Sequence, residues 1–334
     1  GRGMTARGSI LAIALWVIAA LAAAAVAVSS YLSTETRLTR YHLARAQARA
    51  WAKAGVLLAM QRLASDAMQP EDASQPELTY DWLGDDWAVP PDDARQTDPS
   101  RWHVEVAPIP GMVSGAHRVV ITVKDEERLL PLSKALLDVD IVKSLLEDPE
   151  AAQALIEYQD TIKRAKVVVV EEAWALPPFQ ARPELKTVFA EHVSPYTDGP
   201  VNINTLNPEA WKAIVHDPAA NALIDALTQA RDGARGVGAP CHATSKATAA
   251  QELANCARMG DVMPVSQLFN SLDSVVGFDV KSSTFSIVAE GLAGLSNTDV
   301  RYRIGAIVQR NASSARTMMV GSVPFRVVAW RELR

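Results

Sequence analysis

The sequence of 334 residues lacks the short motifs that accompany catalysis. Its clustered glycines, Gly233, Gly236 and Gly238, follow no strand pattern and have the wrong order for a dinucleotide-binding loop. The segment GMVSG at 111–115 places its serine one position too late for a nucleophile elbow. The six histidines are scattered, without the paired spacing of a metalloprotease. These absences predict that the protein is not an enzyme.

A large excess of one charge is also missing. The formal net charge is −5, and 49% of the residues are hydrophobic. Disordered chains combine few apolar residues with a high net charge, and proteins that bind nucleic acid are usually basic. The composition therefore predicts a folded protein without a nucleic-acid partner. Its length leaves room for two domains.

One stretch near the N-terminus has no charge at all. From Ile10 to Val28 no side chain is charged or strongly polar. A helix of this length spans about 28 Å, which is roughly the hydrocarbon thickness of a bilayer. Arg2 and Arg7 precede the run, and the next charge is Glu35. We predict a single membrane-spanning helix over 10–28, with the N-terminus cytoplasmic and the rest of the chain exported.

A cleaved signal peptide is the alternative, because AVA at 25–27 matches a small-residue cleavage site. The apolar run is longer than the roughly 7 to 15 residues of a signal-peptide core. Helix-favouring residues also continue beyond it, with no proline before Pro70. A loose apolar stripe at helical spacing follows the span, formed by Leu38, Tyr41, Ala48, Trp51, Val56 and Leu63. The pattern predicts one helix of about 50 to 60 residues that keeps its apolar first half.

Cysteine is scarce, with Cys241 and Cys256 alone in the sequence. In an exported chain, a disulfide that closes this short loop would contribute about 3 kcal/mol to stability. A zinc site that uses His242 is the other interpretation, but no fourth ligand lies at a familiar spacing. The spacing favours the disulfide.

A short basic leader that ends in Gly8, followed by a long helix with an apolar first half, resembles the N-terminus of the type IV pilin superfamily. The resemblance implies that prepilin peptidase cuts between Gly8 and Ser9 and that Ser9 becomes the methylated first residue. It also implies that the helix packs against sister helices in a fibre. The apolar residues expected at those contacts are Ile13, Leu15, Trp16 and Leu21.

Ile13 departs from the usual pilin pattern, since most pilins have glutamate at this fifth mature position. Among pseudopilins, the K subunit of type II secretion characteristically lacks that glutamate. A buried carboxylate needs a partner, commonly the terminal amine of the subunit above it. A subunit without this carboxylate is suited to the tip of the fibre.

The rest of the chain predicts a divided sheet. A proline- and aspartate-rich linker from Pro70 to Pro99 is followed by two alternating segments, 101–109 and 117–125, that form a hairpin. Helical patterns continue from about 129 to 277, and strand patterns then return. The fold class is α+β, a pilin-like long N-terminal helix plus an antiparallel sheet, with a large all-α domain inserted between strands. The K pseudopilin family has this same architecture.

The predicted boundaries follow from these patterns. They are a leader at 1–8, the N-terminal helix at 9–65, the linker and first strands at 66–128, the inserted helical domain at 129–280 and the returning strands at 281–334.

The string VNINT, followed by a helix that begins at Asn207-Pro208, is similar to a motif of the K pseudopilin family. The family resemblance extends to LIEYQD, which ends at Asp160, and to PPFQARPEL, where Phe179 and Leu185 would be core anchors. The motif residues are Val201, Asn202, Ile203, Asn204 and Thr205, of which valine and isoleucine would point one way and the two asparagines the other.

VNINT also resembles the opening of helix-hairpin-helix DNA-binding modules. Those modules need a glycine-bounded hairpin, because backbone amides there approach a phosphate closely. Residues 215–219 contain no glycine and place Asp217 in the hairpin. A helical pair used for packing or protein contact is the favoured interpretation.

Acidic residues cluster at several places in the sequence. Asp125, Glu126 and Glu127 are predicted to be solvated surface acids, as are Glu171 and Glu172. The acidic linker is a candidate for calcium (Ca²⁺), because hard cations prefer several flexible oxygens and the family includes calcium-binding members. No spacing selects the ligands, so the metal residues stay unassigned among Asp81, Asp85, Asp86, Asp92 and Asp93.

The resemblance implies a minor pseudopilin of the type II secretion system, similar to the K subunit, which caps the pseudopilus tip and supports export of folded proteins across the outer membrane. Its partners would be the I and J minor pseudopilins, other pseudopilus subunits, the inner-membrane assembly platform and prepilin peptidase. It would be a single-pass protein of the bacterial inner membrane with its body in the periplasm. A type IV pilus minor pilin and an exported helix-hairpin-helix DNA-binding module are the alternatives.

Overall fold

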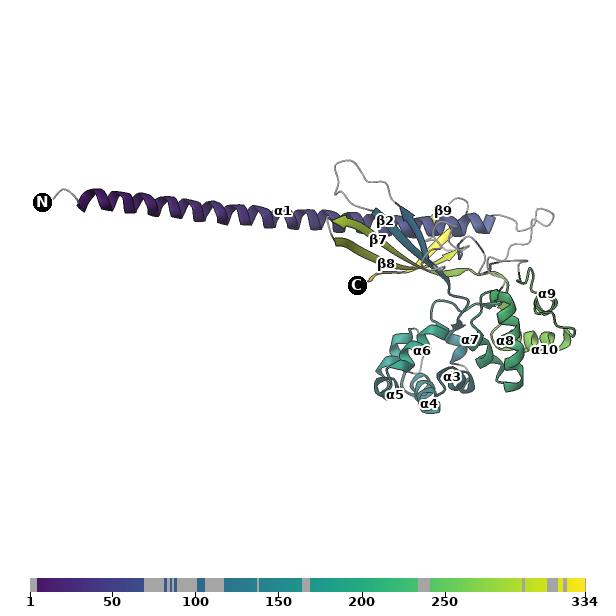
Figure 1. Cartoon of the computed structure of the whole chain (residues 1–334). Helices are drawn as coiled ribbons and strands as arrows, with labels where there is room; N and C mark the ends of the chain where they lie inside the picture. The colour runs from purple at the N-terminus through teal and green to yellow at the C-terminus, as the bar shows by residue number, and fades with distance from the viewer. Residues whose placement is uncertain are drawn as a thin grey trace.

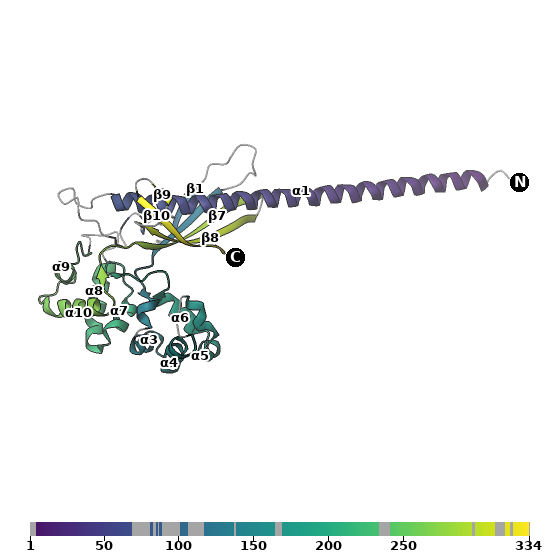
Figure 2. The same cartoon turned by 180° about the vertical axis from the view of Figure 1, so that it is seen from behind.

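The computed structural model describes residues 5–68, 81–82, 85, 87–88, 101–105, 117–136, 138–163, 169–233, 241–295, 298–310, 318–320 and 323–333. One long helix, α1 (Thr5–Met68), projects far beyond a sheet, and a group of short helices lies below that sheet (Figure 1). The view from behind has the same order of layers, with α1 on one face of the sheet and the short helices on the side away from α1 (Figure 2).

Helix α1 has two parts. Its residues are mostly strong helix formers, and it contains no proline. Residues 11–43 are exposed, and from Ala44 onward one face is buried at a spacing of three or four residues. The buried positions include Ala44, Ala48, Ala52, Val56, Ala59 and Leu63. Leu38 and Tyr41 of the predicted stripe precede this packed part and stay exposed.

The sheet has six strands in the order β1-β2-β7-β8-β10-β9, and every neighbouring pair is antiparallel. The predicted hairpin is present as the pair β1–β2. The strands are β1 (Arg101–Glu105), β2 (His117–Asp125), β7 (Thr284–Leu295), β8 (Thr298–Arg310), β9 (Met318–Val320) and β10 (Val323–Leu333).

Two glycines allow α1 to lie close to the sheet. A Cβ atom on Gly291 of β7 would lie 2.0 Å from the carbonyl oxygen of Ala48 and 2.8 Å from the amide nitrogen of Ala52. A Cβ atom on Gly55 of α1 would lie 2.7 Å from Cγ1 of Val119. The missing side chains therefore permit backbone contact between helix and strand.

The chain between β2 and β7 is mainly helical. Its elements are β3 (Leu130–Pro131), α2 (Leu132–Ala135), α3 (Val139–Leu146), α4 (Pro149–Glu157), the π-helix η2 (Tyr158–Lys163), the 3₁₀-helix η3 (Val170–Ala175), α5 (Pro177–Ala181), α6 (Glu184–His192), β4 (Val193–Ser194), β5 (Val201–Asn202), α7 (Pro208–Val215), α8 (Pro218–Gly233), α9 (Ala249–Cys256), α10 (Met263–Val275) and β6 (Phe278–Asp279).

Local sequence explains several of these helix starts. Asp138, Asp148 and Asn207 each accept a hydrogen bond from a backbone amide in the first turn of α3, α4 and α7. Pro208 occupies the first turn of α7, so the helix start predicted at Asn207 is confirmed. The predicted anchors Phe179 and Leu185 are also buried in the core of the helical region.

The helical region interrupts the sheet at one point. Strands β2 and β7 are neighbours, and Asp125 at the end of β2 pairs with Phe285 near the start of β7. The chain therefore leaves the sheet and returns to it at the same end. The predicted α+β class, with a long N-terminal helix on an antiparallel sheet and a helical region between strands, is confirmed.

Candidate functional site

The first candidate surface is the apolar stem, which we define as residues 11–32 of α1. Its large apolar side chains are exposed, from 51% for Val17 to 78% for Trp16, and Ile13, Leu15 and Leu21 lie between these values. Among the described residues, α1 is the one helix long and apolar enough to cross a membrane. An exposed apolar surface of this length requires lipid or other helices around it. Gly8 and Ser9 fall within α1, but their side chains lie outside the described residues.

The motif VNINT lies where the helical region joins the sheet. All five side chains are buried, so its asparagines do not face solvent as a simple strand pattern predicts. β5 contains Val201 and Asn202 and pairs in parallel with β6. Asn204 binds the backbone of Ala243 twice, with its side-chain oxygen accepting from N at 2.7 Å and its amide donating to O at 2.9 Å. The asparagine side chains therefore form hydrogen bonds with backbone groups of neighbouring segments, which a strand of only two residues cannot satisfy with its own backbone.

Asn202 connects the motif to a buried polar group. Its side-chain amide donates to the carbonyl oxygen of Asp81 at 3.0 Å and to the hydroxyl of Ser282 at 2.7 Å. It also donates to Asp125 at 3.3 Å. The hydroxyls of Thr205 and Ser282 donate to the same Asp125 oxygen. We call this group, together with Asp66, Glu127, Ser283 and Arg310, the polar junction.

The prediction that Asp125, Glu126 and Glu127 are solvated surface acids is wrong. They are 2%, 8% and 4% exposed. Each accepts hydrogen bonds from other parts of the chain, as when Glu127 accepts from both the amide and the hydroxyl of Ser283. The acids are buried because Asp125 ends β2 and Glu126 and Glu127 follow it, at the point where the chain leaves the sheet for the helical region.

Burial changes the titration of this group. It raises the pKa of Asp125 to about 6, although hydrogen bonds from Ser282 and Thr205 oppose the rise. Burial, with repulsion from Asp125, raises the pKa of Glu127 to about 8. Burial, with repulsion from Asp81, likewise raises the pKa of Asp66 to about 8. Near neutral pH the polar junction therefore holds protonated carboxyl groups.

Arg310 supplies the positive charge of the polar junction. Its guanidinium contacts both carboxylate oxygens of Asp81, donates to Asp66 at 3.2 Å and donates to the carbonyl oxygen of Leu63 at 3.2 Å. It also donates from Nε to the carbonyl oxygen of Ser282 at 3.1 Å. One side chain at the end of β8 therefore joins the end of α1, the segment around Asp81 and the last residues of the helical region.

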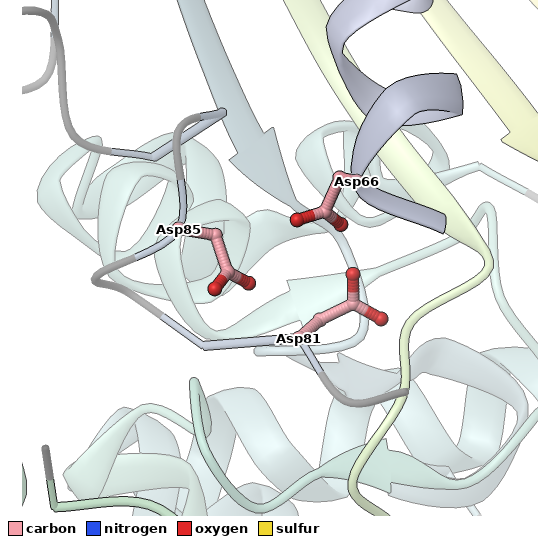
Figure 3. A group of neighbouring side chains, drawn as sticks. All are labelled: Asp66, Asp81 and Asp85. Carbon is pink, nitrogen blue, oxygen red and sulfur yellow. The ribbon is translucent and has the colours of Figure 1, made fainter. Parts of the chain in front are cut away.

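The candidate calcium linker is only partly described. Asp81 and Asp85 lie with Asp66, and one carboxylate oxygen from each falls within 4.8 Å of the others (Figure 3). Arg310 contacts two of these acids, and Asp85 accepts from the backbone amide of Trp82 and the indole of Trp87. Protein donors thus contact at least one carboxylate oxygen of each of the three acids, in competition with any cation. The remaining candidates, Asp86, Asp92 and Asp93, lie outside the described residues.

The two cysteines lie together. Cys241 and Cys256 form a disulfide with a Cα–Cα distance of 5.6 Å, which joins the chain after α8 to the end of α9. The ring of His242, next to this pair in sequence, packs against Trp82 with a centroid distance of 4.8 Å and an interplanar angle of 36°. Burial lowers the pKa of His242 to about 4.

The helical pair α7–α8 has the features of a packing unit. Trp211 and Ile214 of α7 are buried in the helical core. The connection places His216 in the left-handed conformation, with φ of 54°, and the carboxylate of Asp217 accepts from the amide of Ala219 at 2.9 Å. A carboxylate therefore occupies the Ala219 amide, at the position where a DNA-binding hairpin would present its amides to a phosphate.

The raised pKa values predict how stability depends on pH. Asp66 and Glu127 bind their protons more tightly in the folded than in the unfolded chain, so the free energy of unfolding should fall as pH rises from about 4 to about 8. Glu127→Gln should reduce this slope, because glutamine still accepts from Ser283 but does not titrate. Urea unfolding at a series of pH values measures the effect. Glu209→Gln, an exposed change, is the control, and an equal slope in Glu127→Gln and wild type would contradict the assignment.

The fold of the chain is similar to that of a protein of known structure. No protein-family model matches the chain, and no curated protein sequence matches it. The chain is similar to a chain in the crystal structure of the GspK-GspI-GspJ complex from the type 2 secretion system of enterotoxigenic Escherichia coli, with a TM-score of 0.51 and 15% sequence identity. The likeness covers 90% of this chain and 99% of that one. The fold is pilin-like. It follows that the helical region between the strands belongs to the shared architecture.

The structure brings together some of the predicted residues and separates others. The five VNINT residues meet at the boundary between helical region and sheet, whereas Ile13, Leu15, Trp16 and Leu21 are on the stem, far from it (Figure 1). Sequence reasoning missed Arg310 and the burial of Asp125. The alternation of buried and exposed positions could have identified both residues. It places Asp125 among the buried positions of β2 and Arg310 among those of β8.

Proposed function

We propose that the chain is a minor pseudopilin of a type II secretion system, of the K kind, that caps the tip of the pseudopilus. The observation that carries the proposal is the fold likeness over 90% of the chain to a member of the GspK-GspI-GspJ complex. The departure at Ile13 and the VNINT motif, found from sequence, support the same family. Its role would be structural, in support of the export of folded proteins.

The apolar stem gives the proposal a physical mechanism. In the inner membrane, lipid would surround its exposed side chains, with the N-terminus in the cytoplasm and the sheet and helical region in the periplasm. On extraction into a fibre, the stem would exchange lipid for the helices of I and J minor pseudopilins and other subunits. Close van der Waals packing would drive this exchange, and the many alanines of the stem favour it.

The helical region would end the fibre. It lies below the sheet, on the side away from α1 and toward the end of the molecule opposite the N-terminus (Figures 1 and 2). A second subunit stacked above would meet this bulk. Ile13 would also offer no carboxylate to the terminal amine of such a subunit. Both features are suited to a tip position.

Processing by prepilin peptidase is the direct test. Co-expression of the full chain with an active peptidase should yield a product that begins at methylated Ser9, as measured by intact and N-terminal mass analysis. Gly8→Leu should remain uncut, because the branched side chain replaces the small residue at the cleavage point. The processed chain should then co-purify with I and J minor pseudopilins. A mature start near Val28 would indicate signal peptidase instead and would contradict the proposal.

A further inference from the structure

Charge is unevenly distributed along the chain. Residues 1–68, 100–128 and 281–334, which hold α1 and the sheet, contain 20 lysines and arginines against 9 acids. Residues 69–99 and 129–280, which hold the linker and the helical region, contain 13 against 29. The net charge of −5 is therefore the sum of a positive charge on the helix-and-sheet part and a larger negative charge on the remainder. The helical region lies toward the end of the molecule that is far from the N-terminus (Figure 1).

The arginines nearest the C-terminal end of the apolar stem are exposed and form no ion pair within the described residues. Arg37 and Arg40 lie on the exposed stretch of α1 between the stem and the sheet, and Arg45 is an exposed residue at the start of the packed part. Within the described part of the chain, none of these three makes an ion pair, whereas Arg49, one turn further on, pairs with Glu332 at 2.5 Å. Glu35 is the one acid in this stretch. Within the described residues, the fold therefore gives Arg37 and Arg40 no ion-pair partner.

Helix geometry sets how far each arginine stands from the stem. At about 1.5 Å per residue, Arg37 and Arg40 lie about 8 and 12 Å beyond Leu32 along the axis, and Arg45 lies about 20 Å beyond it. The headgroup layer of a bilayer is about 5 to 8 Å thick on each side. Side chains on a helix point back toward its N-terminus, so Arg37 and Arg40 reach into that layer and Arg45 does not. Tyr31 sits at the boundary, where aromatic rings favour the interface.

We propose that Arg37 and Arg40 bind the phosphate groups of anionic phospholipids at the end of the apolar stem, as a headgroup site that holds α1 at a fixed depth. A guanidinium forms paired hydrogen bonds with a phosphate, and within the described residues neither Arg37 nor Arg40 forms an ion pair with a carboxylate that would compete. The packed part of α1 begins at Ala44, about 18 Å beyond Leu32 along the axis, and the acidic helical region lies still further from the stem (Figure 1). This separation exceeds the Debye length of about 8 Å, so the acidic region does not cancel the attraction. The proposal rests on the membrane anchoring proposed above.

The test uses the full chain in vesicles of phosphatidylcholine that contain spin-labelled lipids. Association of labelled phosphatidylglycerol with the protein, relative to labelled phosphatidylcholine, is measured by electron paramagnetic resonance. The double variant Arg37→Gln/Arg40→Gln should lower this relative association about fivefold, since Glu35 offsets part of the charge. Arg45→Gln, the matched control at greater distance, should leave it within about a factor of two. High salt should reduce the wild-type preference toward that of the double variant.

Flotation of every variant with vesicles after alkaline washing separates the two proposals. If wild type is not retained, the anchoring itself fails. If all variants are retained but the double variant keeps the wild-type lipid preference, the headgroup site is wrong while the anchoring stands. An equal loss in Arg45→Gln would also overturn the site, because it would indicate a diffuse charge effect. Loss of binding to an acidic protein partner with an unchanged lipid preference would assign these arginines to that partner instead.

Discussion

Replacing Arg310 by methionine should destabilise the folded chain by about 3 to 5 kcal/mol, because the change removes one partner of a buried ion pair and leaves the other in place. The guanidinium is the only cation of the polar junction, as we define it, and it contacts both oxygens of Asp81. Its loss also frees the carbonyl oxygens of Leu63 and Ser282. Urea unfolding of the full chain in detergent micelles, followed by tryptophan fluorescence, measures the change.

Arg49→Met is the matched control for this substitution. Arg49 forms an ion pair with Glu332 in which both side chains are about half exposed, so its loss should cost about 0 to 1 kcal/mol. Arg310→Lys should fall between the two, since a lysine keeps the charge but does not reach all the oxygens that the guanidinium contacts. Equal effects of the two methionine variants would mean that the polar junction does not hold the helical region to the sheet.

The elements of the fold were largely predictable because each depends on nearby residues. The unbroken helical propensity up to Pro70 predicts α1, and alternation over 117–125 predicts β2. Asn207 followed by Pro208 predicts the start of α7. Even the division of the sheet followed from pattern, since helical periodicity between two sets of strand periodicity indicates an insertion. These patterns depend on residues that are close in sequence, and the structure contains the elements that they predict.

The polar junction was not predictable in the same way, because its members are distant in sequence. Arg310 meets Asp66 and Asp81, which precede it by 244 and 229 positions. The alternation did contain a partial signal. Asp125 continues the buried positions of β2, and Arg310 continues those of β8, so each strand ends with a charge on its buried side. Opposite charges at the buried ends of two strands indicate a polar contact there, although only the fold identifies the partners.

Gly291→Ala should be the most damaging single-methyl change in the sheet. A Cβ atom there would lie 2.0 Å from the carbonyl oxygen of Ala48, which belongs to the backbone of α1 and does not rotate away. The helix would have to move off the strand, and the packing of Ala52 would open with it. We expect a loss of about 3 kcal/mol or more in the free energy of unfolding, at the upper end of what overpacking usually costs.

Gly305→Ala is the control that distinguishes contact with α1 from the general effect of adding a methyl group to a strand. Gly305 lies on β8, next to β7, but its Cβ would meet Cδ1 of Leu333 at 3.3 Å, the end of a flexible and partly exposed side chain. Alanine there should be tolerated or slightly stabilising, because it reduces the freedom of the unfolded chain. Since both glycines lie in central strands, a similar loss at both would point to strand conformation as the cause. A loss at Gly291 alone would establish that the close approach of α1 to β7 holds the packed half of the long helix on the sheet.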